Sequence, residues 1–231
     1  MSSLIRFIRD VSSHHLHVIR DDGLYRHLRF ERPNTNAYYF DIVTWPGYLT
    51  VTGDMGTWTF SRITDMFEFF TDSHFGSRES FQINPQYWSE KFESGAGGSR
   101  YDSPCFEFDD EDFQKSLNEW LACYIAECED EHDREMAKDA VSELVSEEYR
   151  NAWMAGQAVN DAVFPSDVSN WDILDEMGSL QKHSHHYIWI CYAIVWGIER
   201  YNNQKLTLKA METFLAFSPM RSDDRGEVSN G

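Results

Sequence analysis

Two histidines and two aspartates near the start of the chain are residue types that bind divalent metals. His15 and His17 alternate in an expected strand, so their side chains lie on the same face. Asp21 and Asp22 follow within the next residues, and carboxylate with imidazole is a ligand set that suits zinc and related ions. These four residues indicate a metal-dependent hydrolase or nuclease as one interpretation. Their spacing matches no known zinc signature, and HEXXH is absent.

The remaining histidine and Asp-Gly segments have simpler structural explanations. On a helix His183 and His186 would be neighbours, and we expect them to cap an aromatic-rich core. The sequence DDG at residues 21–23 favours a tight turn over a magnesium site, and GDMG at residues 53–56 favours a hairpin turn capped by Asp54. No GK[ST] follows it, which excludes a phosphate-binding loop. GxSxG and Cys–His signatures are also absent, so the sequence predicts no nucleophile.

Acidic residues are concentrated in one stretch of the chain. Residues 107–148 hold 16 Asp and Glu against three Lys and Arg, a balance of −13 within a total of −19. Residues 1–62, with seven Arg and six acidic side chains, are close to neutral. Read as a helix, the second half of the acidic stretch sets five carboxylates four residues apart, climbing about 6 Å at each step. They are Glu131, Glu135, Asp139, Glu143 and Glu147.

The regular row of carboxylates costs free energy, about 0.2–0.5 kcal/mol for each like-charged pair at this spacing. One explanation is a solvated helix face whose repulsion is tolerated. The other is a binding surface, because duplex DNA also carries negative charge every few ångströms and a carboxylate row could imitate a phosphate track. An earlier acidic cluster would contribute to the same surface. It comprises Asp109, Asp110, Glu111 and Asp112.

The elements that must position these residues begin with a β-rich segment. Between residues 14 and 62, stretches rich in Tyr, Phe, Thr, Val and Trp alternate with turn sequences. Connections this short predict an antiparallel meander of three to five strands. We expect short helices to cover its apolar face, one capped by Thr64 or Asp65 and another beginning at Asn84 and Pro85.

From Asp109 onward the pattern is helical. Apolar residues recur at steps of three and four in two stripes, over residues 113–128 and 137–153. The segment "HHYIWICYAIVWGIERY" is apolar on most sides, so we expect it at the buried centre of the helical region, followed by a final helix over "LTLKAMETFLAF". Several tryptophans are expected in the core rather than in a base-stacking surface. They are Trp88, Trp120, Trp153, Trp171, Trp189 and Trp196.

The sequence therefore predicts an α+β fold, with an N-terminal antiparallel β-meander covered by short helices and followed by a helical C-terminal region. We place the β-rich region at residues 1–94, a Gly/Ser-rich linker at 95–104, the acidic helical region at 105–217 and a flexible tail at 218–231. The sheet and the last apolar segment each need a partner, so we expect the two regions to share one core.

Composition limits the classes of partner. With 42% hydrophobic residues the chain can build a core, while a net charge of −19 and a pI near 4.7 disfavour nucleic acid or anionic lipid and suit basic protein surfaces. The four cysteines lack zinc-ribbon spacing and are expected to be reduced. "MSSLIRFIRDVSS" has no long apolar segment, which argues against a signal peptide. The longest uncharged apolar run is 12 residues, too short to span a bilayer.

Several segments resemble a family of accessory proteins carried by tailed bacteriophages and prophages. They are "DDGLYRHLRFERP", "WPGYLTVTGDMGTWTFSRITDMFEFF", "INPQYWSEK" and "HHYIWICYAIVWGIERY". The likeness covers residues 14–93 and 185–203 and leaves out the acidic helices and the tail. The family has no assigned reaction, so the resemblance implies no catalytic residues. It implies a protein made in the cytoplasm of an infected bacterium, in a class that often interferes with host or defence machinery.

We therefore hypothesise a phage-encoded, non-enzymatic inhibitor of a host or anti-phage protein that handles nucleic acid, such as a CRISPR effector, a restriction enzyme or a recombination nuclease. Its carboxylate face would occupy the basic groove of that target, no cofactor would be needed, and a homodimer is left open. Two alternatives remain. One is the metal-dependent enzyme built on the N-terminal His and Asp residues, and the other is a scaffolding protein of the phage cycle whose acidic face only solvates its helix.

Overall fold

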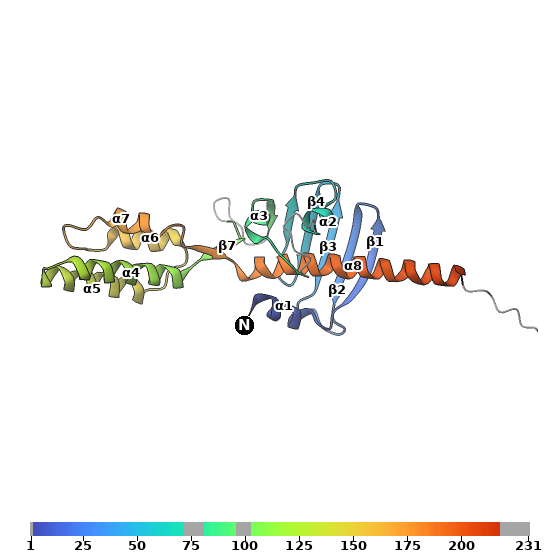
Figure 1. Ribbon diagram of the computed structural model, residues 1–231, viewed down its shortest axis with the longest axis horizontal. Helices are drawn as coiled ribbons and strands as arrows, with labels where there is room; N and C mark the ends of the chain where they lie inside the picture. Colours follow the sequence, from blue (N-terminus) through green and yellow to red (C-terminus); the bar gives the residue numbers. More distant parts are fainter. Residues whose placement is uncertain (1, 72–80, 96–102, 218–231) are drawn as a thin grey trace, which may run out of the picture. The chain divides into compact units, whose positions relative to one another are not determined.

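The chain folds into two compact units in a computed structural model that describes residues 2–71, 81–95 and 103–217 (Figure 1). The sheet unit comprises Met1–Ser94 and Trp189–Gly231, and the helical unit comprises Gly95–Ile188. The sheet unit is thus built from both ends of the chain. Most of the predicted linker and the whole predicted tail lie outside the described residues.

The sheet unit is organised around a six-stranded sheet in which the strands follow one another in chain order. The register pairs β1 to β5 as antiparallel neighbours, as the short connections require. The predicted α+β class and antiparallel meander are confirmed, and β6 is a strand that the sequence pattern did not predict. The strands are β1 (His15–Asp22), β2 (Tyr25–Glu31), β3 (Phe40–Trp45), β4 (Tyr48–Gly53), β5 (Trp58–Ser61) and β6 (Phe92–Gly95).

Alternation along the strands gives the sheet one apolar and one polar face. Leu28 and Phe30 on β2 and Ile42 on β3 are fully buried on the apolar face. Thr50 and Thr59, which pair across β4 and β5 on the opposite face, share a hydrogen bond of 2.9 Å between their hydroxyl groups. The apolar face therefore requires a cover.

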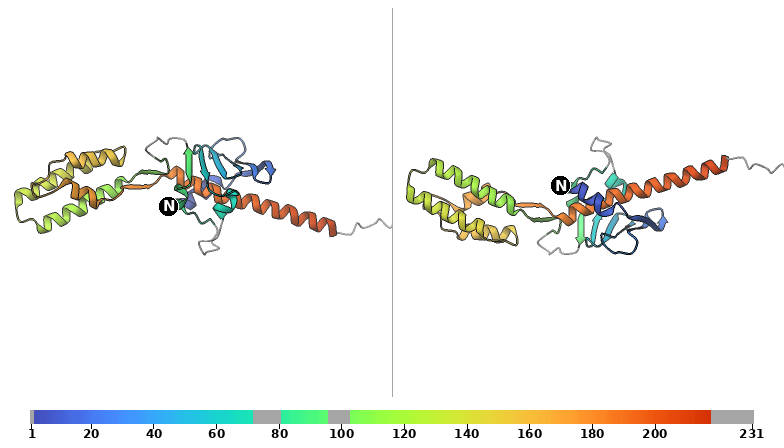
Figure 2. Two further views of the ribbon diagram at one scale, coloured as in Figure 1. Left: turned by 90° about the horizontal axis from the view of Figure 1, so that it is seen from above. Right: turned by 90° about the horizontal axis from the view of Figure 1, so that it is seen from below.

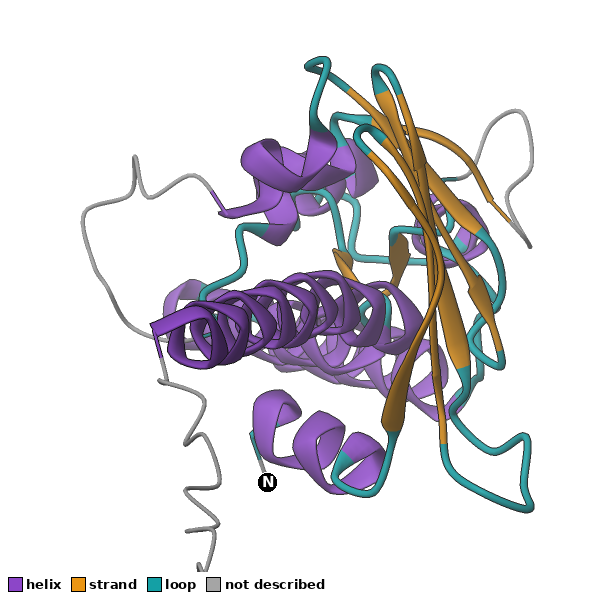
Figure 3. Ribbon diagram, turned by 90° about the vertical axis from the view of Figure 1, so that its right-hand side faces the viewer, coloured by secondary structure: helices purple, strands orange, loops and turns teal. Residues whose placement is uncertain are grey.

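The main cover is the long C-terminal helix α8 (His185–Phe217), with α1 (Ser3–Val11) beside it on the same face of the sheet (Figure 3). Ile190, Ile194 and Ile198 of α8 are buried. The ring of Trp196 meets Phe30 edge-on, with 5.3 Å between ring centroids. The prediction that this apolar segment forms the centre of the helical region is wrong, because from Trp189 it belongs to the sheet unit.

A glycine allows α8 to approach the sheet closely. A Cβ atom placed on Gly197 would lie 2.6 Å from Cδ1 of Ile42 and 3.2 Å from the ring of Phe30. Real Cβ atoms do not come this close to other atoms. The short distance between α8 and the sheet at this point therefore requires glycine, which has no side chain. No helix within the described residues is long and apolar enough to cross a membrane.

Two short helices lie between β5 and β6 in the chain, and the sequence predicted both. The helices are α2 (Met66–Thr71) and α3 (Pro85–Ser89). Asp65 begins α2 by accepting a 2.9 Å hydrogen bond from the backbone N–H of Phe67, and Asn84 begins α3 by accepting one of 3.2 Å from Tyr87. Both predicted caps are confirmed, with Asp65 rather than Thr64 in the first.

The helical unit contains four helices and a small two-stranded ribbon in its described part (Figure 2). Its buried core comprises residues between Phe113 and Leu180, so the prediction of one shared core is confirmed for α8, which packs on the sheet, and is wrong for the helices before it. The elements are β7 (Phe106–Phe108), α4 (Asp110–Glu127), α5 (Glu131–Ser146), α6 (Ala152–Asp161), α7 (Asn170–Glu176) and β8 (Gln181–His183).

Candidate partner-binding groove

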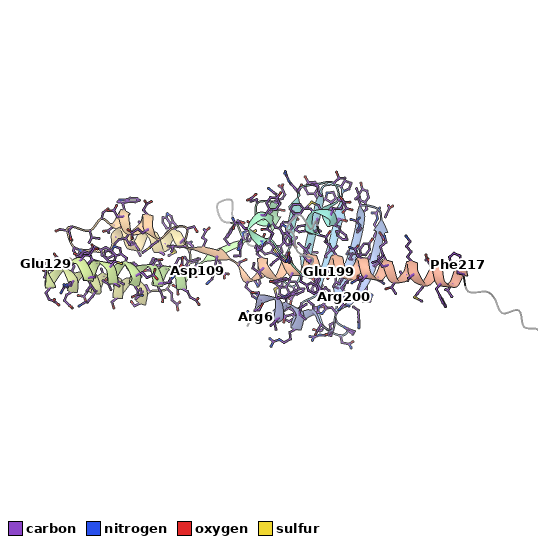
Figure 4. The ribbon with its side chains drawn as sticks, in the orientation of Figure 1. Arg6, Asp109, Glu129, Glu199, Arg200 and Phe217 are labelled. Atoms are coloured by element: carbon purple, nitrogen blue, oxygen red, sulfur yellow. The ribbon has the colours of Figure 1, made fainter. Side chains whose placement is uncertain are left out.

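Helices α4 and α5 form an antiparallel hairpin whose two starting points are set by aspartates. Asp109 caps α4 by accepting a hydrogen bond from Asp112 N–H, at 3.3 Å. Asp130 caps α5 by accepting from the N–H groups of His132 and Asp133, at 2.8 and 3.2 Å. Carboxylates satisfy these otherwise unpaired donors and also interact favourably with the helix dipole. Figure 4 marks Asp109 at the start of α4 and Glu129 at the turn of the hairpin.

Core packing turns the acidic residues of α5 outward. Ala140, Val141 and Leu144 face the core of the helical unit, where they meet Phe113 and Leu117 of α4. The five carboxylates of the predicted row are all exposed. The expectation that the row lies on the surface of a helix therefore holds for α5, although Glu147 ends the helix as its C-cap in extended conformation.

The row does not form one straight face. In an α-helix each step of four residues drifts by about 40°, so the two ends of the row point in different directions. Glu131 lies 3.4 Å from Arg134, and Glu135 forms an ion pair with Lys138. The first two carboxylates are thus partly neutralised by cations of the same helix.

The other three carboxylates of the row line a groove. Asp139, Glu143 and Glu147 border a hollow of about 480 Å³ between α5 and α6. Asp161 of α6 faces them from the opposite wall. None of the four pairs with a Lys or Arg side chain among the residues that the structure describes. The floor and remaining walls are mainly apolar: Met136, Ala140, Leu144, Tyr149, Ala158, Ala162 and Val163.

The phenol of Tyr149 is affected by the negative charge of the groove. Burial raises its pKa above the ordinary value, and the carboxylates of Glu147 and Glu143 raise it further by opposing the phenolate. The ring is held by an edge-on contact with Phe113, at 5.4 Å between centroids. Tyr149 therefore stays neutral at physiological pH and forms part of an amphipathic wall.

The earlier acidic cluster has structural tasks at the start of α4. Besides capping the helix, Asp109 lies 3.2 Å from Lys182 of β8. Asp110 accepts a 2.9 Å hydrogen bond from the amide of Gln114. Glu111 and Asp112 are exposed in the first turn. These four residues do not line the groove, so the structure does not bring the two predicted acidic clusters together in one pocket.

Two tryptophans that the sequence analysis assigned to the core are instead exposed. Trp153 on α6 and Trp171 on α7 are each 71% exposed, whereas Trp88, Trp189 and Trp196 are buried as predicted. Val163 at the groove is 75% exposed. Large apolar side chains on a charged surface are typical of sites that bind other proteins. A helical wheel of α6 could have identified Trp153, because Ala155 and Val159 occupy the opposite, buried side.

The proposed metal ligands of β1 are separated by a β-bulge. The pairing of β1 with β2 shifts between Val18 and Arg20, which turns Asp21 toward α8. Asp21 accepts a 2.7 Å hydrogen bond from the Tyr201 hydroxyl and lies 3.0 Å from Lys205. The Tyr201 hydrogen bond and then Lys205 hold the pKa of Asp21 below its ordinary value, against the opposing effect of burial.

The other members of that set have separate neighbours. Asp22 forms an exposed ion pair with Arg20 at 3.0 Å, and His17 faces Glu31. In the described parts of the chain no three His, Cys, Asp or Glu side chains come together as a metal site would require. The hypothesis that His15, His17, Asp21 and Asp22 share a metal is therefore contradicted by their placement.

The remaining candidates are structural. The carboxylate of Asp54 accepts a 2.8 Å hydrogen bond from Tyr38 N–H in the segment before β3, so it ties two loops together rather than capping its own turn as predicted. His183 stacks on Phe106 at 4.9 Å. No disulfide joins the cysteines, all of which lie in the described part of the chain. They are Cys105, Cys123, Cys128 and Cys191.

Comparison of the chain with protein-family models, with curated proteins and with solved structures returns no match.

Proposed function

We propose that this protein is a non-enzymatic binding protein whose groove between α5 and α6 receives a basic surface of another protein. The observation that carries the proposal is the set of four carboxylates without cationic partners over an apolar floor. Asp139, Glu143 and Glu147 come from one wall of the groove and Asp161 from the other. A partner that supplies Lys or Arg would neutralise charges that the chain itself leaves open among its described residues.

The kind of partner follows from the arrangement of charge. Successive carboxylates at four-residue spacing lie about 6 Å apart along a helix, a distance of the same order as the phosphate spacing that nucleic-acid-binding proteins recognise. The apolar floor would accommodate the methylene stems of Lys and Arg while their charged ends meet the carboxylates. The partner we propose is therefore a protein whose basic surface normally binds nucleic acid.

The resemblance to phage accessory proteins supplies a biological setting for this proposal. In that setting the chain would be an inhibitor made in the cytoplasm of an infected bacterium. It would occupy the nucleic-acid site of a host or anti-phage protein. CRISPR effectors, restriction enzymes and recombination nucleases all present such sites, and no cofactor is needed for competitive occupation.

The test compares two variants that remove the same number of charges. The groove variant carries Asp139→Asn, Glu143→Gln and Glu147→Gln. The control carries Glu119→Gln, Glu127→Gln and Glu129→Gln, which are exposed on α4 and the turn after it. The partner would be identified by affinity purification from infected cells and then purified, so that dissociation constants can be measured for each variant.

We expect the groove variant to bind about 100-fold more weakly and the control to bind within about threefold of the wild type, because only the first loses close charge pairs. Duplex DNA should compete with the wild-type protein for the partner, and added salt should weaken binding. An equal loss of affinity in both variants would show that binding depends on the net charge of the protein and not on the groove. Unchanged binding of the groove variant would exclude the groove as the site.

A further inference from the structure

The last three turns of α8 extend beyond the sheet, past the edge strand β1 (Figure 1). Residues 206–217, the arm, carry six large apolar side chains that are between 53% and 83% exposed. They are Leu206, Leu208, Met211, Phe214, Leu215 and Phe217. Figure 4 marks Phe217 at the end of the arm. An exposed patch of this kind on a folded chain indicates an interaction surface.

The arm continues the pattern by which α8 packs on the sheet. Ile190, Ile194, Gly197 and Tyr201 are spaced by steps of three and four and are in the sheet unit's interior. The same steps lead through Gln204 to Leu208, Met211 and Leu215, where the sheet has ended. The stripe of α8 that packs on the sheet thus continues into the arm. No described residue of the chain covers the part of the stripe that lies in the arm.

The apolar surface of the arm is wide and sharply bounded. At 100° per residue the six side chains spread over about 200° of the helix. Lys205, Lys209 and Glu212 occupy the remaining sector. One helix packed alongside would cover only part of an arc this wide. The arm can therefore contact both a second helix and the protein surface next to that helix.

We propose that the arm pairs with the arm of a second copy of this chain, antiparallel, to form a homodimer. Charge favours this occupant. The chain carries −19 overall, so two copies repel over most of their surfaces, but residues 205–217 hold two Lys and one Glu and are nearly neutral. The same net charge disfavours an anionic membrane as the occupant.

The area of the arm matches what a dimer requires. Six side chains that each present on the order of 100–150 Å² together offer about 700 Å², close to the ~800 Å² that each partner of a stable complex buries. Antiparallel pairing is isologous, so both arms are covered by the same contact and no further copy is recruited.

A groove beside the base of the arm is placed to receive the end of the second copy's arm. It has a volume of about 690 Å³ and lies between α8 and the start of β1. Arg200, Asn203 and Thr207 line it from α8, and His14 and Leu16 line it from the other side. If the arms cross between Leu208 and Met211, the far end of one arm comes level with residues 202–207 of the other. The terminal aromatic rings would then lie beside Phe81 and Trp196, which also line the groove.

The test uses the full chain and measures its mass in solution by sedimentation over a range of concentrations. The disrupting variant carries Met211→Glu and Leu215→Glu in the apolar arc. The control carries Lys209→Gln and Ala216→Glu in the polar sector, which changes the net charge by the same amount. All four positions are exposed, so neither variant should alter the fold, as circular dichroism would verify.

We expect the wild type and the control to be dimers at concentrations on the order of 10 µM, and the disrupting variant to associate about 100-fold more weakly. Amide hydrogens of residues 206–217 should exchange slowly in the first two proteins and fast in the third. A wild type that stays monomeric, or a disrupting variant that stays dimeric, would overturn the proposal. A monomer that floats with phosphatidylcholine vesicles would instead assign the arm to a lipid surface.

Discussion

The hydroxyl of Tyr201 donates a 2.7 Å hydrogen bond to Asp21, joining the C-terminal helix to the first strand of the sheet. Burial raises the pKa of Tyr201, and its hydrogen bond to Asp21 raises the pKa further. Lys205, one turn later on α8, donates to the Tyr201 hydroxyl at 3.0 Å. A carboxylate held in this way stabilises the contact between β1 and α8 and is not free to bind a metal. The position of Asp21 is thus explained by packing.

The first prediction concerns the close approach of α8 to the sheet. Replacing Gly197 by Ala places a Cβ atom 2.6 Å from Ile42, and the fully buried Ile42 and Phe30 have little room to move. We expect the free energy of unfolding of the sheet unit to fall by about 1–3 kcal/mol, measured by chemical denaturation. Gly156→Ala on α6 is the control, because its Cβ would meet only Leu174 at 3.8 Å. It should be neutral or stabilise by up to about 1 kcal/mol, and equal destabilisation by both would contradict the argument.

The second prediction concerns the ion pair of Arg26 with Asp65, whose two hydrogen bonds measure 2.8 and 2.7 Å. The hydrogen bonds from Arg26 hold the pKa of Asp65 below its ordinary value of 3.8, although burial opposes the shift. Asp65→Asn should cost about 3 kcal/mol at pH 7, because it leaves a largely buried guanidinium without its counter-charge. Asp22→Asn is the control, since its pair with Arg20 is exposed and should cost less than about 1 kcal/mol.

The pH dependence of the same pair follows from the direction of the shift. A carboxyl group with a lowered pKa in the folded state stabilises the fold above its ordinary pKa and loses this contribution as the pH falls through the folded value. The difference in unfolding free energy between wild type and Asp65→Asn should therefore be constant above about pH 5 and shrink below about pH 4. A difference that stayed constant down to pH 2 would contradict the role of the Asp65 charge.

The third prediction separates the two halves of the acidic row on α5. Glu131→Gln with Glu135→Gln removes charges already paired with Arg134 and Lys138. Glu143→Gln with Glu147→Gln removes two charges of the groove. The second pair should slow association with the proposed basic partner by about tenfold at low salt, and the first by less than about threefold. Stopped-flow measurements at several salt concentrations would test this, and equal effects would mean that the row acts as a whole.

The fourth prediction concerns the exposed tryptophans of the helical unit. Trp171→Ala and Trp153→Ala should leave the unfolding free energy within about 0.5 kcal/mol of the wild type, because each ring is 71% exposed. If either ring anchors the proposed partner, its loss should weaken binding by about 2 kcal/mol or more, measured by calorimetry. Trp120→Ala is the comparison, since its ring packs on Phe164 at 5.1 Å and its removal should destabilise the unit. A loss of stability in all three variants would contradict the surface assignment.

Local features of the fold could be predicted from the sequence, because they depend on near neighbours. Strand alternation located β2 to β5, and the Asn84-Pro85 pair located the start of α3. The location of the apolar segment that begins near Trp189 was predicted only in part, because the sequence analysis expected it both to share a core with the sheet and to form the centre of the helical region. Its side chains suit any apolar surface, and tertiary contacts such as the close approach at Gly197 make the sheet its partner.

The candidate site was predicted in part for a related reason. Spacing identified the five carboxylates of α5, but the cations that neutralise two of them and the wall that Asp161 adds depend on tertiary packing. Likewise the bulge after Val18 could not be inferred from composition, and it is this bulge that separates Asp21 from His17. Proximity of His and Asp residues in the sequence therefore suggested a metal site that the fold does not assemble.

The discontinuous make-up of the sheet unit has a consequence for biosynthesis. The ribosome releases β1 to β6 first, then the whole helical unit, and only at the end the helix that covers Phe30 and Ile42. Until that helix has been synthesised, the apolar face of the nascent sheet is exposed to water. In this state the sheet can bind a chaperone or aggregate. A chain cut short before Trp189 would keep its helical unit and would leave its sheet permanently in that unfinished condition.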